Sequence, residues 1–501
     1  MTTKNRLIIN HSERPYYDLA VIGGGLSATA TIIKMLSASR TQLNQDINKM
    51  KQIIVFDKED SFGGGNTYSS AMADATFLQN PVDMMPDGFA EWIISKGIEW
   101  LAAWCFHTSS TTRQWWQEHK DAITRRQLAS LFVPRGLFGL YQTESYRSAL
   151  SAAKESVVVQ HVAKQVTGLI RTENDDFILK TASDIQIRAR IVLLAMGMIP
   201  SKPFPEAVSY LDKLPEKFVV NLASKAKAHG GNIILLGANA AAMDVIHLFS
   251  TYESALTGIN EIIVVSKTGI MPISTSPITG LEPSSSLIAH PTSPRNAAEL
   301  VSIVLNDAAC WHEAKLAPYG LTLKGISNAI IASLNSLPAK ERTRILEFHG
   351  RELSLISRRC VPAYYSDFKK LKSSGRLKIL AAEVNSVCKI TSGISVNFSG
   401  ELPDLKATAV IDCSGAGRLN ETNDPLLAQL LRAEGGKLAQ ANAAGSGFVV
   451  NDRFEASPNL FIMGDLLTGY EGRHGMIWHL QNAPRIKHYS SILGEVIAER
   501  L

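Results

Sequence analysis

Residues 18–28 read Asp-Leu-Ala-Val-Ile-Gly-Gly-Gly-Leu-Ser-Ala, an apolar strand followed by Gly-x-Gly-x-x-Ala and a helical run over 29–37. Gly23 permits a tight turn, and Gly25 has no Cβ, so the main chain can approach a pyrophosphate closely. Ala28 lets the helix pack against the strand, and the helix N-terminus then faces the phosphates. The strand before the glycines and the helix after them predict a dinucleotide-binding unit rather than a structural turn without a ligand.

A second strand, expected over 53–56, ends in Asp57. A carboxylate at this position of a βαβ unit is placed to bind a ribose hydroxyl. Asp57 lies 32 residues after Gly25 (57 − 25), whereas about 20 is usual. The polar stretch 37–52 accounts for the difference as a lengthened helix end and loop.

Composition excludes several classes of protein. Lys and Arg outnumber Asp and Glu by only 51 to 46, and no basic run is interleaved with aromatic residues, so no nucleic-acid partner is expected. No apolar run reaches the roughly 18 residues of a membrane span, and the polar segment 1–17 does not resemble a secretory signal. The five cysteines are scattered without a Cys-x-x-Cys pair, which predicts reduced thiols, no metal site and a cytoplasmic protein: Cys105, Cys310, Cys360, Cys388 and Cys413.

A second dinucleotide-type unit begins with a strand expected over 233–236 and continues through Gly237 and Asn239 into a helix over 243–249. The next strand ends in Ser266 and Lys267 instead of an acid, and a hydroxyl beside an ammonium suits the 2′-phosphate of NADP. Asn239 stands where a glycine is expected, and its side chain occupies space that a pyrophosphate needs. Two interpretations follow, a nicotinamide site or a structural second unit.

The order of these units predicts an α/β protein with two Rossmann-like domains, the second inserted in the first. Strands that end in small residues, near 193–197 and 409–415, are expected to mark the two crossings between them. The expected division is a first domain over 1–200, a second over 201–408 with a helical insertion at about 295–352, and the rest of the first over 409–501.

In these motifs the chain resembles the bacterial flavoprotein monooxygenases with two dinucleotide-binding domains, a family that includes amine N-hydroxylases of natural-product pathways. The resemblance covers nearly the whole chain. Besides the first glycine motif, it rests on several segments, which in chain order are Gly63-Gly-Gly-Asn-Thr-Tyr-Ser69, Phe77-Leu-Gln-Asn-Pro81, Phe132-Val-Pro-Arg135, Arg358-Arg-Cys-Val-Pro362, Asp424-Pro-Leu-Leu427 and Leu460-Phe-Ile-Met-Gly-Asp465.

The resemblance implies that FAD lies in the first domain, with its pyrophosphate at Gly23, Gly25 and Ala28 and its adenosine ribose at Asp57. Gly464 and Asp465 are expected at the ribityl chain, where a carboxylate can accept a hydrogen bond from a hydroxyl. Further FAD contacts are expected at Leu26, Ser27, Lys58, Gly63, Gly65, Asn66, Val166 and Gly197. NADPH contacts are expected at Gly237, Asn239, Ser266 and Lys267.

Two catalytic residues are predicted. Asn80 is expected beside the isoalloxazine, because a neutral amide preserves a flavin hydroperoxide better than an acid does. The alternative is that Asn80 caps the turn before Pro81. His474, or His479, is expected near the substrate, and a structural role is the alternative for each. Five of the seven tryptophans fall within 92–116, where they either enclose a dry substrate pocket or pack a core.

The implied function is an FAD-dependent monooxygenase that uses NADPH and O₂ to oxygenate a small nucleophilic substrate through a flavin C4a-hydroperoxide. The resemblance favours an amine or amino acid as the substrate. Asn239 keeps a second enzyme class open, a flavin dehydrogenase or oxidase that does not use NADPH. A non-catalytic flavoprotein is the third alternative. The expected partner is a small molecule, with no membrane, and the sequence assigns no oligomeric state.

Overall fold

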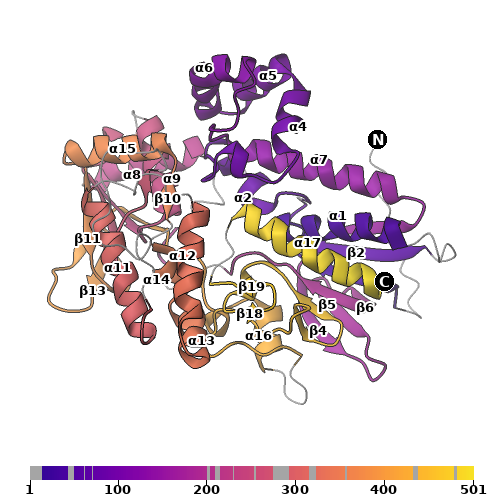
Figure 1. Cartoon of the computed structure of the whole chain (residues 1–501). Coiled ribbons are helices and arrows are strands. Elements are labelled where there is room, and N and C mark those ends of the chain that lie inside the picture. Colours follow the sequence, from indigo (N-terminus) through magenta and orange to yellow (C-terminus); the bar gives the residue numbers. More distant parts are fainter. Residues whose placement is uncertain are drawn as a thin grey trace.

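The computed structural model contains two α/β domains side by side (Figure 1). It describes residues 14–42, 50–60, 62–69, 71–199, 204–208, 215–229, 231–252, 256–274, 293–314, 323–355, 358–432, 438–478 and 482–501.

The first domain is built on an eight-stranded sheet. Its strands are β1 (Tyr16–Ile22), β2 (Lys51–Asp57), β3 (Val157–Ala163), β4 (Val166–Arg171), β5 (Phe177–Thr181), β6 (Gln186–Leu194), β16 (Glu455–Ser457) and β17 (Leu460–Ile462). The order β16-β17-β6-β1-β2-β3 places β1 between parallel neighbours, with β5 and then β4 running antiparallel from β6. β1 and β6 are largely buried apolar runs, as a parallel sheet covered on both faces requires.

The second domain repeats this arrangement. Its strands are β7 (Asn232–Leu236), β8 (Glu261–Ser266), β11 (Leu377–Ala381) and β15 (Ala409–Asp412), with a separate antiparallel group of β12 (Val384–Ile390), β13 (Gly393–Phe398) and β14 (Leu405–Ala407). The order β11-β8-β7-β15 matches β3-β2-β1-β6 of the first sheet strand for strand. β15 therefore corresponds to β6, the exit strand of the first domain.

The pairing of β15 corrects one expected boundary. We expected the chain to return to the first domain at residue 409, but Ala409–Asp412 pairs in parallel with β7 in the second sheet. The crossing therefore comes after Asp412. Cys413 continues this path, because its N–H donates to the carbonyl of Leu236 (2.9 Å).

Helices cover both sheets. Those of the first domain are α1 (Leu26–Gln42), α2 (Gly65–Ser69), α3 (Ala71–Asp74), α4 (Phe89–Lys96), α5 (Ile98–Thr108), α6 (Ser110–Thr124), α7 (Arg135–Ala153), α16 (Pro425–Arg432) and α17 (Ala483–Arg500), with 3₁₀ turns η1 (Val82–Met84), η2 (Leu419–Glu421) and η3 (Gly464–Leu467). α1 packs against α7 and α17, and α4–α6 project from the domain (Figure 1).

The second domain carries α8 (Pro215–His229), α9 (Ala240–Thr251) and α15 (Pro362–Ser373). The expected helical insertion is present as α11 (Ala297–Ala314), α12 (Leu323–Asn335), α13 (Ala339–Phe348) and α14 (Gly350–Leu355). This insertion lies between two short paired strands, β9 (Ile273–Ser274) and β10 (Arg359–Cys360). The remaining hairpin is β18 (Glu471–Gly472) with β19 (Gly475–Met476).

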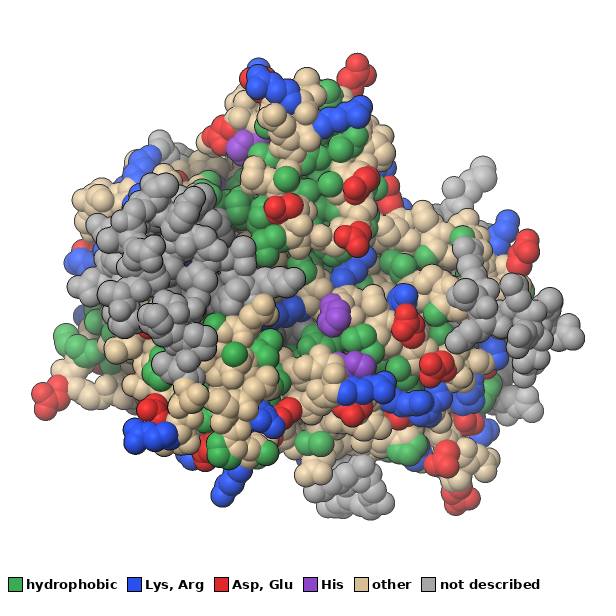
Figure 2. All heavy atoms as spheres, in the orientation of Figure 1, with side chains coloured by type: hydrophobic (Ala, Val, Ile, Leu, Met, Phe, Trp, Pro, Cys, Tyr) green, Lys and Arg blue, Asp and Glu red, His purple; other side chains and the backbone are tan. Residues whose placement is uncertain are grey.

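The aromatic residues of α4–α6 pack mainly as core. Trp115 and Trp116 are buried, and Trp92, Trp100 and Trp104 lie against the same apolar cluster. Hydrophobic side chains also gather on the outer surface of these projecting helices (Figure 2), where Ile98 and Phe106 are more than two-fifths exposed.

Candidate functional site

The first glycine loop follows β1 and joins it to α1. Gly23 has a φ of +105°, and its N–H donates to the carbonyl of Phe56 on β2 (2.8 Å). A Cβ at this position would lie 2.2 Å from the carbonyl oxygen of Ala195. Gly23 is therefore required by the turn and by the close approach of β6, independently of any ligand.

Gly25 is different, because it faces a second glycine loop. A Cβ built on Gly25 would lie 3.5 Å from the Cα of Gly65, at an ordinary contact distance, and the φ of Gly25 is not positive. Gly65, at the start of α2, has a φ of +64°. Two loops without side chains thus face each other at the N-terminus of α1, and this geometry leaves their main chains accessible to a phosphate.

Hydrogen bonds fix the two glycine loops to each other. The N–H of Gly63 donates to the carbonyl of Gly24 (2.9 Å), and the Oγ1 of Thr29 donates to the carbonyl of Gly63 (2.9 Å). Gln142 on α7 donates its Nε2 to Thr29 (2.9 Å). Both main-chain polar groups of Gly63 are therefore held by the first domain, as a preformed cofactor site requires.

Asp57 lies where the sequence places it, at the end of β2 beside the first glycine loop. Its Oδ2 accepts a hydrogen bond from the N–H of Gly24 (2.6 Å), and its Oδ1 accepts one from the N–H of Glu59 (2.9 Å). A carboxylate has about four lone-pair positions, so the two remaining positions can accept ribose hydroxyls.

Gly464 and Asp465 close the site from the C-terminal segment. Gly464 has a φ of +82°, and a Cβ there would lie 3.2 Å from the Oγ of Ser27 in the first turn of α1. Burial raises the pKa of the Asp465 carboxyl to about 6. No side-chain hydrogen bond to it is found among the described residues. A partly buried carboxyl without a side-chain partner beside the first glycine loop fits a hydroxyl donor from a ligand.

This raised pKa gives a testable stability effect. The folded apoprotein binds more protons at Asp465 than the unfolded chain does between the usual pKa of 3.8 and the folded value of about 6, so its stability falls as the pH rises through that window. Asp465→Asn should therefore raise the thermal midpoint of the apoprotein at neutral pH and weaken FAD binding. Calorimetry of the apoprotein and FAD titration measure the two effects.

Asp74 provides the matched control, because burial also raises its pKa to about 6. Asp74→Asn should stabilise the apoprotein and leave FAD affinity unchanged. Equal FAD affinity in wild type and Asp465→Asn would remove Asp465 from the cofactor site.

The segment Phe77–Asn80 contains two amide side chains, and the structure adds Gln79 to the candidate residues. The Oε1 and Nε2 of Gln79 are both buried without a hydrogen-bond partner among the described residues. The partly buried amide of Asn80 has no side-chain hydrogen bond to the described residues either, and both alternatives for Asn80 stay open. The unpaired buried amide of Gln79 indicates a missing ligand or water. The only sequence signal for Gln79 was its position next to Asn80.

In the second glycine loop, Asn239 is already engaged with the protein. Its Oδ1 accepts from the N–H groups of Ala241 (2.9 Å) and Ala242 (3.4 Å), and its Nδ2 donates to the carbonyl of Cys413 (2.6 Å). Asn239 is thus the N-cap of α9. Gly237 has the same backbone geometry as Gly23. Its φ is +110°, and a Cβ built on it would lie 2.5 Å from the carbonyl oxygen of Cys413. The loop at Gly237 thus has the backbone of a dinucleotide-binding loop, but the side chain of Asn239 already binds N–H groups at the start of α9 that a phosphate would need.

Ser266 and Lys267 lie at the end of β8, as expected, and both have protein partners. The Oγ of Ser266 accepts from the N–H of Gly269 (3.0 Å). Lys267 pairs with Glu383 (2.5 Å), and both side chains are more than half exposed. An exposed pair of this kind contributes little to stability, so a phosphate can compete for the ammonium.

Two arginines add positive charge beside this second loop. Arg358 donates to the carbonyl of Ala238 (3.3 Å), and Arg351 donates to the carbonyl of Ala416. Burial, and then the charge of Arg351, lower the pKa of Arg358 to about 10. A desolvated guanidinium with a like-charged neighbour favours a bound anion.

The other predicted residues divide into two groups. Leu26, Ser27 and Ala28 form the buried first turn of α1, and Gly197 follows β6 with open space at its Cβ position. Asn66 and Lys58 are exposed near the loops, and Val166 is buried at the start of β4. The His474 ring contacts Arg473, the carbonyl of Asp452 and the ring of Phe454, contacts that hold the β18–β19 turn. His479 lies outside the described residues.

Comparison with known proteins identifies the class. Residues 20–199 match the family described as FAD-NAD(P)-binding. The match agrees with a dinucleotide-binding first domain, and the structure adds a second dinucleotide fold. FAD and a nicotinamide dinucleotide are confirmed as its expected cofactors. Proteins from Mycobacterium tuberculosis and Mycobacterium bovis, both described as uncharacterised, are 22% identical to it over 96% of this chain and 95% of theirs.

Two solved structures share the fold over almost the whole chain. One is an ornithine N-hydroxylase from Kutzneria, 13% identical, with a TM-score of 0.53 and coverage of 97% of this chain and 99% of that chain. The other is a cadaverine monooxygenase of desferrioxamine biosynthesis from Erwinia amylovora, 11% identical, with a TM-score of 0.53 and coverage of 96% and 94%. The resemblance to two-domain flavoprotein monooxygenases is thus confirmed in the fold.

Among the residues that the structure describes, no helix is both long and apolar enough to cross a membrane. The same part of the chain has no group of three or more His, Cys, Asp or Glu side chains arranged to hold a metal ion.

Proposed function

We propose that this protein is an FAD-dependent monooxygenase that uses NADPH and O₂ to oxygenate the nitrogen of a small amine or amino acid. The observations that carry the proposal come from the first domain, where two facing glycine loops lie beside the Gly464–Asp465 turn and the segment 77–80 contains a buried amide, that of Gln79, without a partner among the described residues. The shared fold with an ornithine N-hydroxylase and a cadaverine monooxygenase supports an amine as the substrate.

Different residues bind different parts of FAD in this proposal. The main chain of the first loop and of α1 binds the pyrophosphate, Asp57 accepts from the adenosine ribose, and Asp465 accepts from the ribityl chain. Gln79 and Asn80 offer neutral donors and acceptors to the isoalloxazine. When bound, FAD would supply the redox chemistry that connects NADPH, O₂ and the substrate. Amides suit this site because they hold the ring without providing an acidic proton.

NADPH would bind at the second loop. For the pyrophosphate to reach the N-terminus of α9, the side chain of Asn239 must rotate away and release its two N–H groups. Arg358 and Arg351 compensate with positive charge beside the loop. Ser266 and Lys267 hold the 2′-phosphate at the end of β8.

The contacts at β8 predict a preference for NADPH. Charge-assisted hydrogen bonds contribute about 1.5–3 kcal/mol, so kcat/KM should favour NADPH over NADH by about ten- to a hundredfold. Lys267→Ala should remove most of that ratio by weakening NADPH alone. Glu383→Gln should increase it, because Glu383 competes with the phosphate for Lys267.

Lys378 is the matched control, since it forms a similar pair with Glu261 at the opposite end of the same two strands (2.5 Å). Lys378→Ala should leave both cofactors unaffected. Equal kcat/KM for NADPH and NADH in the wild type would show that this strand end does not bind the 2′ position.

A flavin dehydrogenase or oxidase that bypasses NADPH is the second candidate, and the self-capped α9 favours it. Oxygen uptake with a panel of amines, sulfides and ketones separates the candidates. The monooxygenase oxidises NADPH faster when its substrate is present and yields a product heavier by one oxygen atom. An oxidase consumes O₂ without NADPH and yields an oxidised product that has gained no oxygen from O₂.

A further inference from the structure

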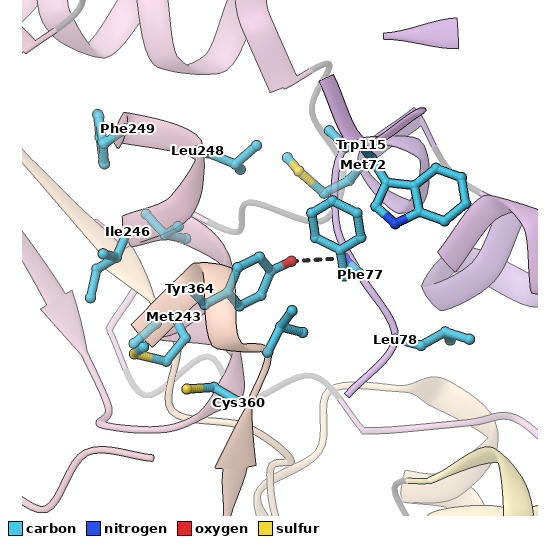
Figure 3. Close-up of a cluster of buried hydrophobic side chains, with 14 of the residues drawn as sticks. Met72, Phe77, Leu78, Trp115, Met243, Ile246, Leu248, Phe249, Cys360 and Tyr364 are labelled. Carbon is cyan, nitrogen blue, oxygen red and sulfur yellow. Dashed lines mark hydrogen bonds between the residues drawn. The ribbon is translucent and has the colours of Figure 1, made fainter. Parts of the chain in front are cut away.

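The two domains share one apolar cluster. Leu248 of α9 and Tyr364 of α15 extend toward Met72 and Phe77 of the first domain (Figure 3), and all four belong to this cluster. Phe77 also contacts the rings of His247 (5.6 Å between centroids) and Tyr364 (5.9 Å). The interface is therefore packed like a domain core, which opposes rotation of one domain relative to the other.

A buried ion pair crosses this apolar interface. Arg135, at the start of α7, binds Asp244 on α9 through both guanidinium nitrogens, with two N–O distances of 2.9 Å. The two residues are 8% and 1% exposed. Desolvation offsets much of the attraction in such a pair, so its main effect is to fix geometry.

Tyr364 and Arg135 hold the peptide groups on the two sides of Phe77. The N–H of Phe77 donates to the hydroxyl of Tyr364 (2.7 Å), the contact drawn in Figure 3. The carbonyl of Phe77 accepts from the Nε of Arg135 (2.8 Å). The Asp244 carboxylate also acts on Tyr364, because burial, then the charge of that carboxylate, raise the pKa of the Tyr364 hydroxyl well above its usual value. One carboxylate of the second domain thus organises both groups that hold Phe77.

We infer that Asp244, a residue of the second domain, is a positioning residue. It fixes the position of the segment 77–80 beside the flavin in the first domain. Asp244 belongs to α9, the helix that begins at the second dinucleotide loop, whereas Gln79 and Asn80 follow Phe77 directly. The second domain thereby acts as a structural part of the flavin site. This inference rests on the proposed function for the presence of flavin at Gln79 and Asn80.

Hydrogen exchange of the peptide that covers 77–80 tests the inference without relying on activity. Tyr364→Phe keeps the ring and removes the acceptor for Phe77, and Asp244→Asn keeps the shape and removes the charge. Both variants should speed exchange in this peptide on the order of tenfold, with exchange in α1 unchanged. With FAD bound, both should lower kcat for NADPH oxidation and leave KM for NADPH unchanged.

Asp367→Asn is the matched control. Asp367 pairs with His247 and Ser250 inside the second domain, at the same interface, and no contact of its carboxylate with Phe77 is found among the described residues. This control should leave exchange at 77–80 unchanged. Unchanged exchange in Tyr364→Phe and Asp244→Asn, or an equal increase in Asp367→Asn, would overturn the inference. A wild-type protein that binds no FAD would instead refute the proposed function, since the exchange result does not depend on flavin.

Discussion

Gly25→Ala is expected to leave the chain folded and to weaken FAD binding by about a hundredfold. The added Cβ would meet Gly65 at an ordinary contact distance of 3.5 Å, and the backbone of Gly25 suits any residue. The apoprotein therefore has no reason to be destabilised. A pyrophosphate that lies on the main chain of this loop, at the N-terminus of α1, would be pushed away by the methyl group. The loss of one or two charge-assisted bonds from the main chain costs about 1.5–3 kcal/mol each.

FAD titration of the apoprotein, followed by flavin fluorescence, measures this effect, and circular dichroism verifies the fold. Gly168→Ala on β4 is the matched control, because its Cβ would also make only ordinary contacts, at 3.5 and 3.6 Å. It should retain full FAD affinity. Gly23→Ala should instead disrupt the fold, since its Cβ would lie 2.2 Å from a carbonyl oxygen. An unchanged FAD affinity in Gly25→Ala would show that the pyrophosphate binds elsewhere.

Asp244→Ala is expected to lower the free energy of unfolding by about 3–5 kcal/mol, because it leaves the Arg135 guanidinium buried without its counter-ion. Asp244 is 1% exposed, and apolar side chains from both domains surround it. Denaturant unfolding, followed by tryptophan fluorescence, measures the change. The double variant Arg135→Met with Asp244→Leu should recover much of the loss, since apolar groups of similar size often replace a buried pair at little cost.

Asp367→Ala is the control for Asp244→Ala. Asp367 bonds His247 within one domain, and its side chain is 23% exposed, so its removal should cost about 1 kcal/mol, as for an ordinary hydrogen bond. A loss in Asp244→Ala no larger than this would contradict a tightly coupled ion pair at the domain interface.

Much of the fold could be predicted from local sequence patterns. Gly23 and Gly237 mark turns whose positive φ values only glycine adopts readily, so both dinucleotide units could be placed from the sequence. The apolar runs of β1, β2, β7 and β8, and the helical periodicity of the insertion, are likewise local. Asp57 could be placed because it ends a strand next to the glycine loop.

Features that depend on distant pairing could not be predicted in this way. The short apolar run Ala409–Asp412 is compatible with either sheet, and only its pairing with β7 assigns it. Arg135 and Asp244 lie 109 positions apart, and nothing local in either segment indicates the other. The cap formed by Asn239 could have been predicted, because asparagine before a helical run is a strong N-cap signal.

In the proposed function, NADPH at the second domain reduces FAD held by the first. Anaerobic stopped-flow mixing of the purified, FAD-loaded protein with NADPH tests this reduction most directly. We expect loss of the yellow flavin absorbance at NADPH concentrations in the millimolar range or below, with a slower loss in Lys267→Ala. A protein that holds FAD and keeps its colour at millimolar NADPH would contradict this proposed reduction.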